Sequence, residues 1–392
     1  MKLPPLSLYL HFPWCVQKCP YCDFNSHQLR DELPEQRYID ALTSDLAAQA
    51  SLVGGREIVS IFMGGGTPSL FSPSALAGLL AEVQKQLHVA PDAEVTMEAN
   101  PATVERGRFA EYHAVGINRV SLGAQSFNSD TLKVLGRIHQ PADVLRAAEE
   151  LHGCGLSNFN LDLMYALPAQ TVAGALADVT SALQLAPAHL SHYQLTLEPG
   201  TVFAAQPPPL PDDDLAWSMQ DECQVLLAAH GFAQYEVSAY ARPGRQCAHN
   251  LNYWSNGDYL GIGAGAHGKI SRIDDEGKRL IIQRSTHLRE PRRYLASAAA
   301  GPQWRDVPQA DLPFEFMMNA LRLNAGFAQE DFVARTGLEE RAVLQPLQRL
   351  ATEGLMETKN GHWRATERGR TFLNEVIQRF LPGPNSQAGA GS

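Results

Sequence analysis

Short hydrophobic runs that suit β-strands recur along the first half of the chain, and each is followed by a stretch with the spacing of a helix. In the first of these stretches Tyr38, Leu42 and Leu46 stand at positions i, i+4 and i+8, so they share one face of a helix. The stretch 72–87 begins with serine and proline, which often start helices. The runs that we predict to be strands are 7–12, 57–63, 94–99, 118–124, 159–164 and 190–196.

Strand and helix alternate at intervals of roughly 30–40 residues, a rhythm typical of βα units around a parallel sheet. Six such units are fewer than the eight that close a barrel. The pattern therefore predicts an α/β fold built on a partial (βα)6 barrel.

The pattern changes after residue 204, where a stretch rich in proline and aspartate indicates a bend or linker. Turn-rich segments with one helix follow. From about residue 305 the spacing predicts helix, helix and hairpin, the outline of a winged helix. We predict a partial barrel at 1–204, a linker and barrel-associated segment at 205–304, a mainly helical, winged-helix-like domain at 305–381, and a disordered tail at 382–392.

A winged helix invites a nucleic-acid-binding interpretation, but the charges argue against it. Between Arg305 and Arg379 there are ten Arg or Lys residues and eleven Asp or Glu residues, whereas a DNA reader normally shows a basic face. The whole chain carries a net charge of −10, which disfavours sequence-independent binding to phosphates. We therefore expect a packing or lid role for this part and no nucleic-acid partner.

The composition is that of a globular protein with a substantial core, because 44 % of the 392 residues are hydrophobic and 19 % are charged. We recognise no signal peptide and no run apolar enough to cross a bilayer, although peripheral contact with a membrane stays compatible with this. We therefore expect a cytoplasmic protein. In that compartment thiols stay reduced, and clustered cysteines bind metal more often than they form disulfides.

Three cysteines with the spacing C-x3-C-x2-C lie within residues 15–22, directly after the first predicted strand. They could hold three irons of a [4Fe–4S] cluster and leave the fourth iron open for chemistry. Zinc is an alternative, and it would need a fourth ligand, for which His11, Asp23 and His27 are candidates. A third interpretation is that the thiols are structural and unconnected.

The later strands also end in polar or very small residues. The glycine-rich run 64–69 follows the second strand and exposes backbone N–H groups. Glu98 lies at the end of the third strand, Gln125 and Arg137 follow the fourth, and Asp162 lies in the fifth. Because ligands gather at the carboxyl ends of the strands in such folds, these residues predict one site together with the cysteines.

These motifs resemble the radical S-adenosylmethionine (SAM) superfamily. Within it, the blocks MGGGTPSL, EANP, SLGAQSFN, LGRIH and LDLMYALPAQT are similar, in this order, to the oxygen-independent coproporphyrinogen III oxidase family, from Tyr9 to the winged-helix-like end. The resemblance implies the partial barrel, a [4Fe–4S] cluster and SAM bound at the open iron. It also implies, in the enzymes of the superfamily, cleavage of SAM to a 5′-deoxyadenosyl radical.

The resemblance further implies roles for single residues, and it assigns no catalytic residue. The implied cluster ligands are Cys15, Cys19 and Cys22. The residues implied to lie against SAM or the cluster are Tyr9 and Tyr21. The residues implied to contact the amino end of SAM are Gly65, Gly66 and Thr67. The residues implied to bind polar groups of SAM, or of a second SAM, are Glu98, Gln125, Arg137 and Asp162.

Phe24 is a departure from the oxidase pattern, since the oxidase has a fourth cysteine at that place. Together with the motif HNLNYW at 249–254, it resembles a heme-chaperone subgroup of the family. The resemblance implies that His249 is a heme ligand, and a neutral imidazole suits that role. The alternative is a loop histidine that caps a turn, with Tyr253 and Trp254 in the local core.

The leading hypothesis is a chaperone that binds heme, a [4Fe–4S] cluster and SAM and delivers heme to acceptor proteins such as respiratory enzymes. Its partners are then heme and heme-accepting proteins. One alternative is an oxygen-independent coproporphyrinogen III oxidase of porphyrin biosynthesis. A second alternative is a winged-helix regulator that senses through an iron–sulfur cluster.

Overall fold

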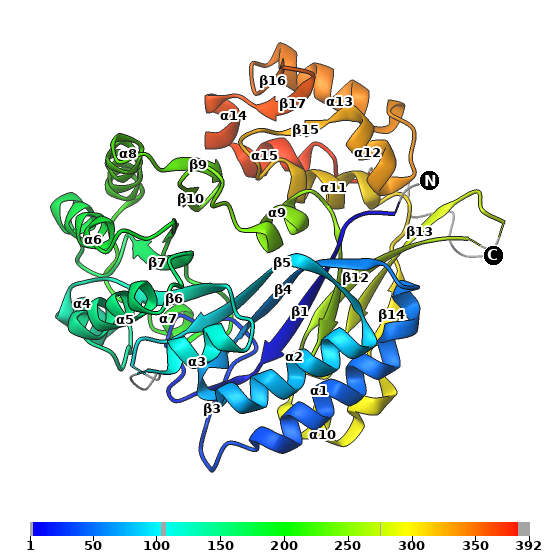
Figure 1. Ribbon diagram of the computed structural model, residues 1–392. Coiled ribbons are helices and arrows are strands. Elements are labelled where there is room, and N and C mark those ends of the chain that lie inside the picture. The colour runs from blue at the N-terminus through cyan, green and yellow to red at the C-terminus, as the bar shows by residue number, and fades with distance from the viewer. Residues whose placement is uncertain (1–2, 103–106, 275, 383–392) are drawn as a thin grey trace.

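The computed structural model describes residues 3–102, 107–274 and 276–382, and its main feature is one twelve-stranded sheet (Figure 1). Six parallel strands form its middle in chain order. They are β1 (Leu6–Phe12), β4 (Glu57–Gly65), β5 (His88–Ala99), β6 (Arg119–Gln125), β7 (Phe159–Tyr165) and β8 (His189–Gln194). These strands confirm the six that the hydrophobic pattern predicted, and the α/β fold with an open (βα)6 arrangement is confirmed with them.

Helices lie between successive strands and cover the outside of the sheet, as Figure 1 shows for α1, α2 and α3. The helices of this part are α1 (Glu35–Ala50), α2 (Pro73–Gln86), α3 (Arg108–Ala114), α4 (Ser129–Val134), α5 (Pro141–Gly153), α6 (Val172–Gln184), α7 (Val202–Ala205) and α8 (Asp213–Ala229). Ser72 caps α2 by accepting a hydrogen bond from the Ala75 N–H, as the Ser-Pro start predicted.

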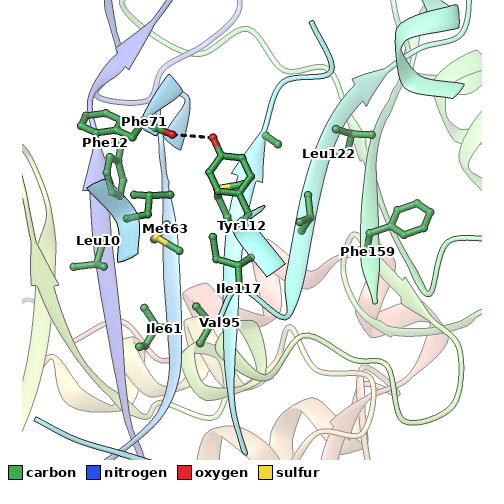
Figure 2. Close-up of a cluster of buried hydrophobic side chains, with 14 of the residues drawn as sticks. Leu10, Phe12, Ile61, Met63, Phe71, Val95, Tyr112, Ile117, Leu122 and Phe159 are labelled. Atoms are coloured by element: carbon green, nitrogen blue, oxygen red, sulfur yellow. Dashed lines mark hydrogen bonds between the residues drawn. The ribbon is translucent and has the colours of Figure 1, made fainter. Parts of the chain in front are cut away.

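The strands alternate between apolar and polar side chains, so each has an outer and an inner face. In β1, Leu8, Leu10 and Phe12 are fully buried in the core shared with the helices. Figure 2 shows this core, in which the Tyr112 hydroxyl donates a 2.8 Å hydrogen bond to the carbonyl oxygen of Phe71. The intervening side chains of β1, Ser7, Tyr9 and His11, are polar. The sheet therefore curves around an interior that is lined by functional groups.

Six further strands extend this sheet at both edges. They are β9 (Ala233–Glu236), β10 (Ala239–Ala241), β11 (Asp258–Ile262), β12 (His267–Ile273), β13 (Leu280–Thr286) and β14 (Gln303–Asp306). β11 pairs with β1, and β10 pairs with β8. The sequence predicted turn-rich segments in this part, but the stretch 259–268 contains most of β11 and the start of β12, with a turn only between these two strands. Two helices also lie in this part: α9 (Ala248–Trp254) and α10 (Pro291–Ser297).

The C-terminal part has its own hydrophobic core and gathers at one end of the sheet (Figure 1). Its helices are α11 (Leu312–Ala320), α12 (Gln329–Thr336), α13 (Arg341–Thr352), α14 (Glu367–Thr371) and α15 (Leu373–Gln378). Its sheet is formed by β15 (Phe327–Ala328), β16 (Met356–Lys359) and β17 (His362–Ala365). This is the winged-helix-like arrangement that the sequence predicted. The predicted disordered tail lies almost entirely outside the described residues.

None of the helices in the described ranges combines the length and the apolar character that crossing a bilayer requires.

Candidate functional site

The cysteine-bearing loop begins where β1 ends and is held in place by backbone hydrogen bonds. The N–H of His27 bonds to the Pro13 carbonyl at 2.7 Å, next to the short paired strands β2 (Trp14–Cys15) and β3 (His27–Gln28). The glycine-rich loop after β4 bonds to the same segment, through Gly66 N–H to Phe12 O at 2.6 Å and Thr67 N–H to Trp14 O at 2.8 Å. The first two strand ends therefore form one fixed unit.

A pocket opens at this unit, at the carboxyl ends of the parallel strands. Its empty volume is about 750 Å3, part of it open to solvent, which is within the range of small-molecule sites. The residues proposed from the sequence that line it are Cys15, Cys19, Tyr21, Cys22, Gly65, Gly66, Thr67, Glu98, Gln125, Arg137 and Asp162. The structure thus brings together residues from five strand ends, and their individual roles stay predictions.

The three thiols of the loop are half-buried and make no disulfide. Burial raises the pKa of Cys15 to about 11, although a hydrogen bond with Thr67 acts in the opposite direction. Burial also raises the pKa of Cys22. Coordination to a metal deprotonates a thiol outright and overrides such shifts.

The donor set of this loop suits a cluster. In the described ranges no three His, Cys, Asp or Glu side chains converge as a single metal ion would require. The thiolates of a [4Fe–4S] cluster each bind a different iron, so they need not meet at one point. Three thiols around one pocket, with no cysteine at Phe24, fit a cluster that keeps one iron open.

Glu98 connects the third strand end to the glycine-rich loop. Its Oε2 accepts a 3.0 Å hydrogen bond from the Gly65 N–H. Burial raises the pKa of Glu98 to about 8, and repulsion from Asp162 adds to the shift. Burial also raises the pKa of Asp162, while hydrogen bonds from Asn160, Ser191 and Ser121 oppose that rise. The pocket therefore holds two carboxyl groups that a cationic ligand would stabilise in their charged forms.

Gln125 and Arg137 carry the signs of a functional position. Gln125 has a φ of 66°, a left-handed conformation that is costly for a residue with a side chain and that concentrates at functional sites. Its Oε1 accepts a 2.8 Å hydrogen bond from the Tyr193 hydroxyl. Arg137 donates to the Gly123 carbonyl at 2.8 Å and to the Cys19 sulfur at 3.6 Å. Arg137 lines the pocket, so its guanidinium places a positive charge there for an anionic ligand group.

Tyr9 lies in a second, adjoining pocket rather than in the first. Its hydroxyl is 3.0 Å from Nδ1 of His11, and it faces the interior of the barrel. The second pocket is lined by Tyr9, His11, Asp23, Phe24, Asn25, Gly65, Glu98, Tyr253, Tyr259, Gly265, His267 and Arg289. Phe24, Gly65 and Glu98 line both pockets, which makes the two spaces neighbours.

His249 lies in the buried interior and lines neither pocket. It is 3 % exposed, its Nδ1 is 3.2 Å from the Ser60 hydroxyl, and its ring stacks on Phe62 at 4.9 Å. The ring of Tyr253 lies 4.8 Å away. Burial, reinforced by the charge of Arg119, lowers the pKa of His249 to about 3. The imidazole is therefore neutral, as a heme ligand must be, but ligation would require neighbouring rings to move.

Several lining residues carry no assignment from the sequence. Ser121, Gly123 and Tyr193 also line the first pocket. Tyr193 comes from β8, and the rule that polar residues at strand ends face the site would have found it. No comparable rule points to Arg289, because it lies in a loop after a strand that the sequence pattern did not reveal.

Comparison with known proteins matches residues 9–178 to the radical SAM superfamily and residues 307–372 to the HemN C-terminal domain. Over 381 residues the chain is 50 % identical to the heme chaperone HemW of Escherichia coli, covering 97 % of this chain and 99 % of that one. The chain belongs to the HemW family of radical SAM proteins. The heme chaperone HemW of Haemophilus influenzae is 47 % identical over 384 residues, with 97 % and 99 % of the two chains covered.

Among solved structures, coproporphyrinogen III oxidase (HemN) of Escherichia coli, described as a radical SAM enzyme, superposes with a TM-score of 0.80. The match covers 96 % of this chain and 90 % of that one, at 22 % sequence identity. At this identity the likeness shows the fold that the HemW family shares with that enzyme.

Proposed function

We propose that this HemW-family protein is a cytoplasmic heme chaperone that binds heme, a [4Fe–4S] cluster and SAM and delivers the heme to acceptor proteins such as respiratory enzymes. The observation that supports it most is the near full-length identity to relatives named heme chaperone. Phe24 supports it independently, because the oxidase family is expected to have a cysteine at that place.

The chain's own groups have distinct tasks in this proposal. Cys15, Cys19 and Cys22 hold the cluster, and a bound cluster supplies an open iron and an exchangeable electron. Arg137 lines the pocket and offers its guanidinium to a carboxylate. Glu98 accepts an ammonium group, a charge-assisted contact that restores its ionised state. Transfer of intact heme breaks no bond in the porphyrin, so none of these residues needs to act as a chemical catalyst.

Phe24 separates the chaperone from the oxidase alternative in physical terms. Its side chain is 59 % exposed and lies at the boundary of the two pockets. It offers an apolar surface and no ligand, so a tetrapyrrole could pack there without a further metal bond. The pocket otherwise retains the polar residues of the oxidase family, which keeps that enzyme as the alternative to test.

The test is heme transfer by the full chain. Protein reconstituted anaerobically with iron, sulfide and SAM is loaded with hemin and mixed with an apo-cytochrome b, and the acceptor's spectrum is followed. We expect the loaded wild type to transfer heme to the acceptor. We expect Cys19→Ser, which cannot hold the cluster, to transfer clearly less heme.

The same preparation is given coproporphyrinogen III, SAM and a reductant without oxygen. Formation of protoporphyrinogen at several turnovers would overturn the proposal in favour of the oxidase. Absence of hemin uptake by the reconstituted wild type would overturn it as well.

A further inference from the structure

The second pocket joins aromatic, cationic and imidazole groups around a space larger than the first. Its empty volume is about 940 Å3, part of it open to solvent. Tyr253 and Tyr259 stack at 4.2 Å and form one wall. Flat aromatic faces of this kind pack well on a porphyrin. The motif HNLNYW therefore contributes Tyr253 to the open space, while its histidine stays behind that ring.

Two histidines line this pocket, and they differ in their freedom to bind. Both ring nitrogens of His11 are engaged, Nδ1 with the Tyr9 hydroxyl and Nε2 with the Asn25 carbonyl, each at 3.0 Å. The ring of His267 is exposed and forms no hydrogen bond within the described ranges. Partial burial, together with the charges of Arg284 and Arg289, lowers the pKa of His267, so its imidazole is neutral and able to bind iron.

His267 is the first residue of β12 and lines the pocket directly after the glycine-rich turn 263–266, which joins β11 to β12. A Cβ on Gly261 would lie 1.9 Å from the His267 carbonyl oxygen, so only glycine lets the two backbones come this close. The turn is fixed by hydrogen bonds from Gly265 N–H to Leu288 O at 2.9 Å and from His287 N–H to Ala266 O at 3.0 Å. A ligand at the start of β12, next to this turn, is therefore positioned before anything binds.

Arg289 supplies a cation beside this histidine. In the part of the chain that the structure describes, no carboxylate forms an ion pair with it, so its guanidinium is available to a propionate. Two carboxyl groups also line the pocket, Asp23 and Glu98. Asp23 is exposed, where solvent screens its charge, and Glu98 is held partly protonated by burial.

From this arrangement we infer that the second pocket is the heme site, with His267 as the iron ligand in place of His249, Tyr253 and Tyr259 against the porphyrin, and Arg289 on a propionate. The inference rests on the proposed function, because it names the site at which the chaperone holds its heme. It places the heme beside the first pocket, across Phe24 and Glu98.

Hemin titration of the full reconstituted chain, followed by the Soret band and by electron paramagnetic resonance, tests the ligand. We expect His267→Ala to weaken binding on the order of tenfold or more and to lose the histidine-ligated spectrum, with partial recovery on addition of imidazole. His249→Ala should keep that spectrum. His88→Ala removes an exposed histidine as the matched control, and thermal unfolding confirms that each variant folds.

A second arm compares hemin with its dimethyl ester, which carries no charge on the propionates. The wild type should prefer hemin, and Arg289→Gln should lose the preference while Arg292→Gln, an exposed neighbour, keeps it.

If His267→Ala binds hemin as the wild type does while His249→Ala loses it, the site is wrong and the chaperone function stands. If the wild type binds no hemin, both the proposed heme site and the chaperone function are wrong. Binding of two SAM molecules, one lost in His267→Ala, would assign the pocket to SAM and overturn the inference.

Discussion

Glu98 lies where a positive ligand would change its protonation. Because the pKa of Glu98 is raised to about 8, first by burial and then by Asp162, the carboxyl is mostly protonated at neutral pH before SAM binds. The ammonium of SAM prefers the ionised form, so the affinity for SAM should rise with pH, approaching tenfold per pH unit between about pH 6 and 7.5. Calorimetry in buffers of different ionisation enthalpy measures the accompanying proton release.

Two variants isolate the source of this pH dependence. Glu98→Gln should bind SAM more weakly at pH 7.5 and show a flat profile. Asp162→Asn should move the inflection of the profile to lower pH without abolishing the pH dependence, since burial is a larger cause of the raised pKa of Glu98 than Asp162 is. An equally steep profile in Glu98→Gln would contradict the assignment of this proton to Glu98.

Gly66 makes the closest backbone contact between the glycine-rich loop and the cysteine loop. A Cβ there would lie 2.6 Å from the Trp14 carbonyl oxygen and 2.7 Å from that of Phe12, and backbone atoms cannot easily move away. We expect Gly66→Ala to lower the free energy of unfolding by about 1–3 kcal/mol and to reduce the iron content after reconstitution, measured by denaturant unfolding and iron analysis.

Gly78 provides the control, because it is exposed inside α2 and a Cβ would meet nothing within 4 Å. Gly78→Ala should raise the free energy of unfolding by about 0.5–1 kcal/mol through the better helix propensity of alanine. Equal changes in the free energy of unfolding for Gly66→Ala and Gly78→Ala would mean that the close contact between the two loops does not contribute to stability.

At the scale of elements, the sequence predicted the six central strands well, because each is a dense hydrophobic run set off by helical spacing. The edge strands escaped prediction for a physical reason. Gly261 lies in β11, Gly268 lies in β12, and Gly263 and Gly265 lie between the two strands. Glycines so close together locally favour turns. The strand conformation of β11 and β12 depends on pairing with β1 and with β13, which is a tertiary effect.

The same limit applies to the candidate site. Strand-end residues such as Glu98 could be predicted, since the carboxyl ends of neighbouring parallel strands lie at the same edge of a sheet. Tyr9 lines the second pocket rather than the first, and His249 is buried. Both features depend on how α9 packs against β1, β4 and β11. No local pattern encodes that packing, and a motif alone cannot tell which of its side chains reaches open space.

Asn25 links the cysteine loop to the turn that precedes His267. Its Nδ2 donates to the carbonyls of Ala264 and Arg289, both at 2.9 Å. We expect Asn25→Ala to speed hydrogen exchange in residues 263–268 and to cost about 1–3 kcal/mol locally, because two acceptors lose their donor. Gln36→Ala is the matched control, since its amide donates to Asp40 on an exposed helix face and to no other group in the described part of the chain. Unchanged exchange in 263–268 would show that the two segments are held independently.

At the scale of the whole molecule, Arg322 is one of several contacts that join the C-terminal part to the large sheet, together with the ion pair of Arg284 and Glu315. Arg322 pairs with the buried Glu236 of β9 at 3.1 Å and lies over the Trp254 ring of α9 at 4.2 Å. Beside it, the Asn324 N–H bonds to the Tyr235 carbonyl at 2.9 Å. The winged-helix-like outline could be predicted from the sequence, but these contacts could not, because they join residues 68 to 90 positions apart.

This junction predicts how the two parts depend on each other. Arg322→Met keeps the stem but leaves Glu236 buried without its cation, so it should lower the free energy of unfolding by about 2–4 kcal/mol. Arg379→Met breaks an exposed pair with Glu353 and should cost less than about 1 kcal/mol. In Arg322→Met, hydrogen exchange should become faster both in α9 and in residues 312–323. Faster exchange in the C-terminal part alone would mean that α9 is held by the barrel without its help. Because α9 also carries Tyr253, a shared loss would tie the C-terminal part to the wall of the second pocket.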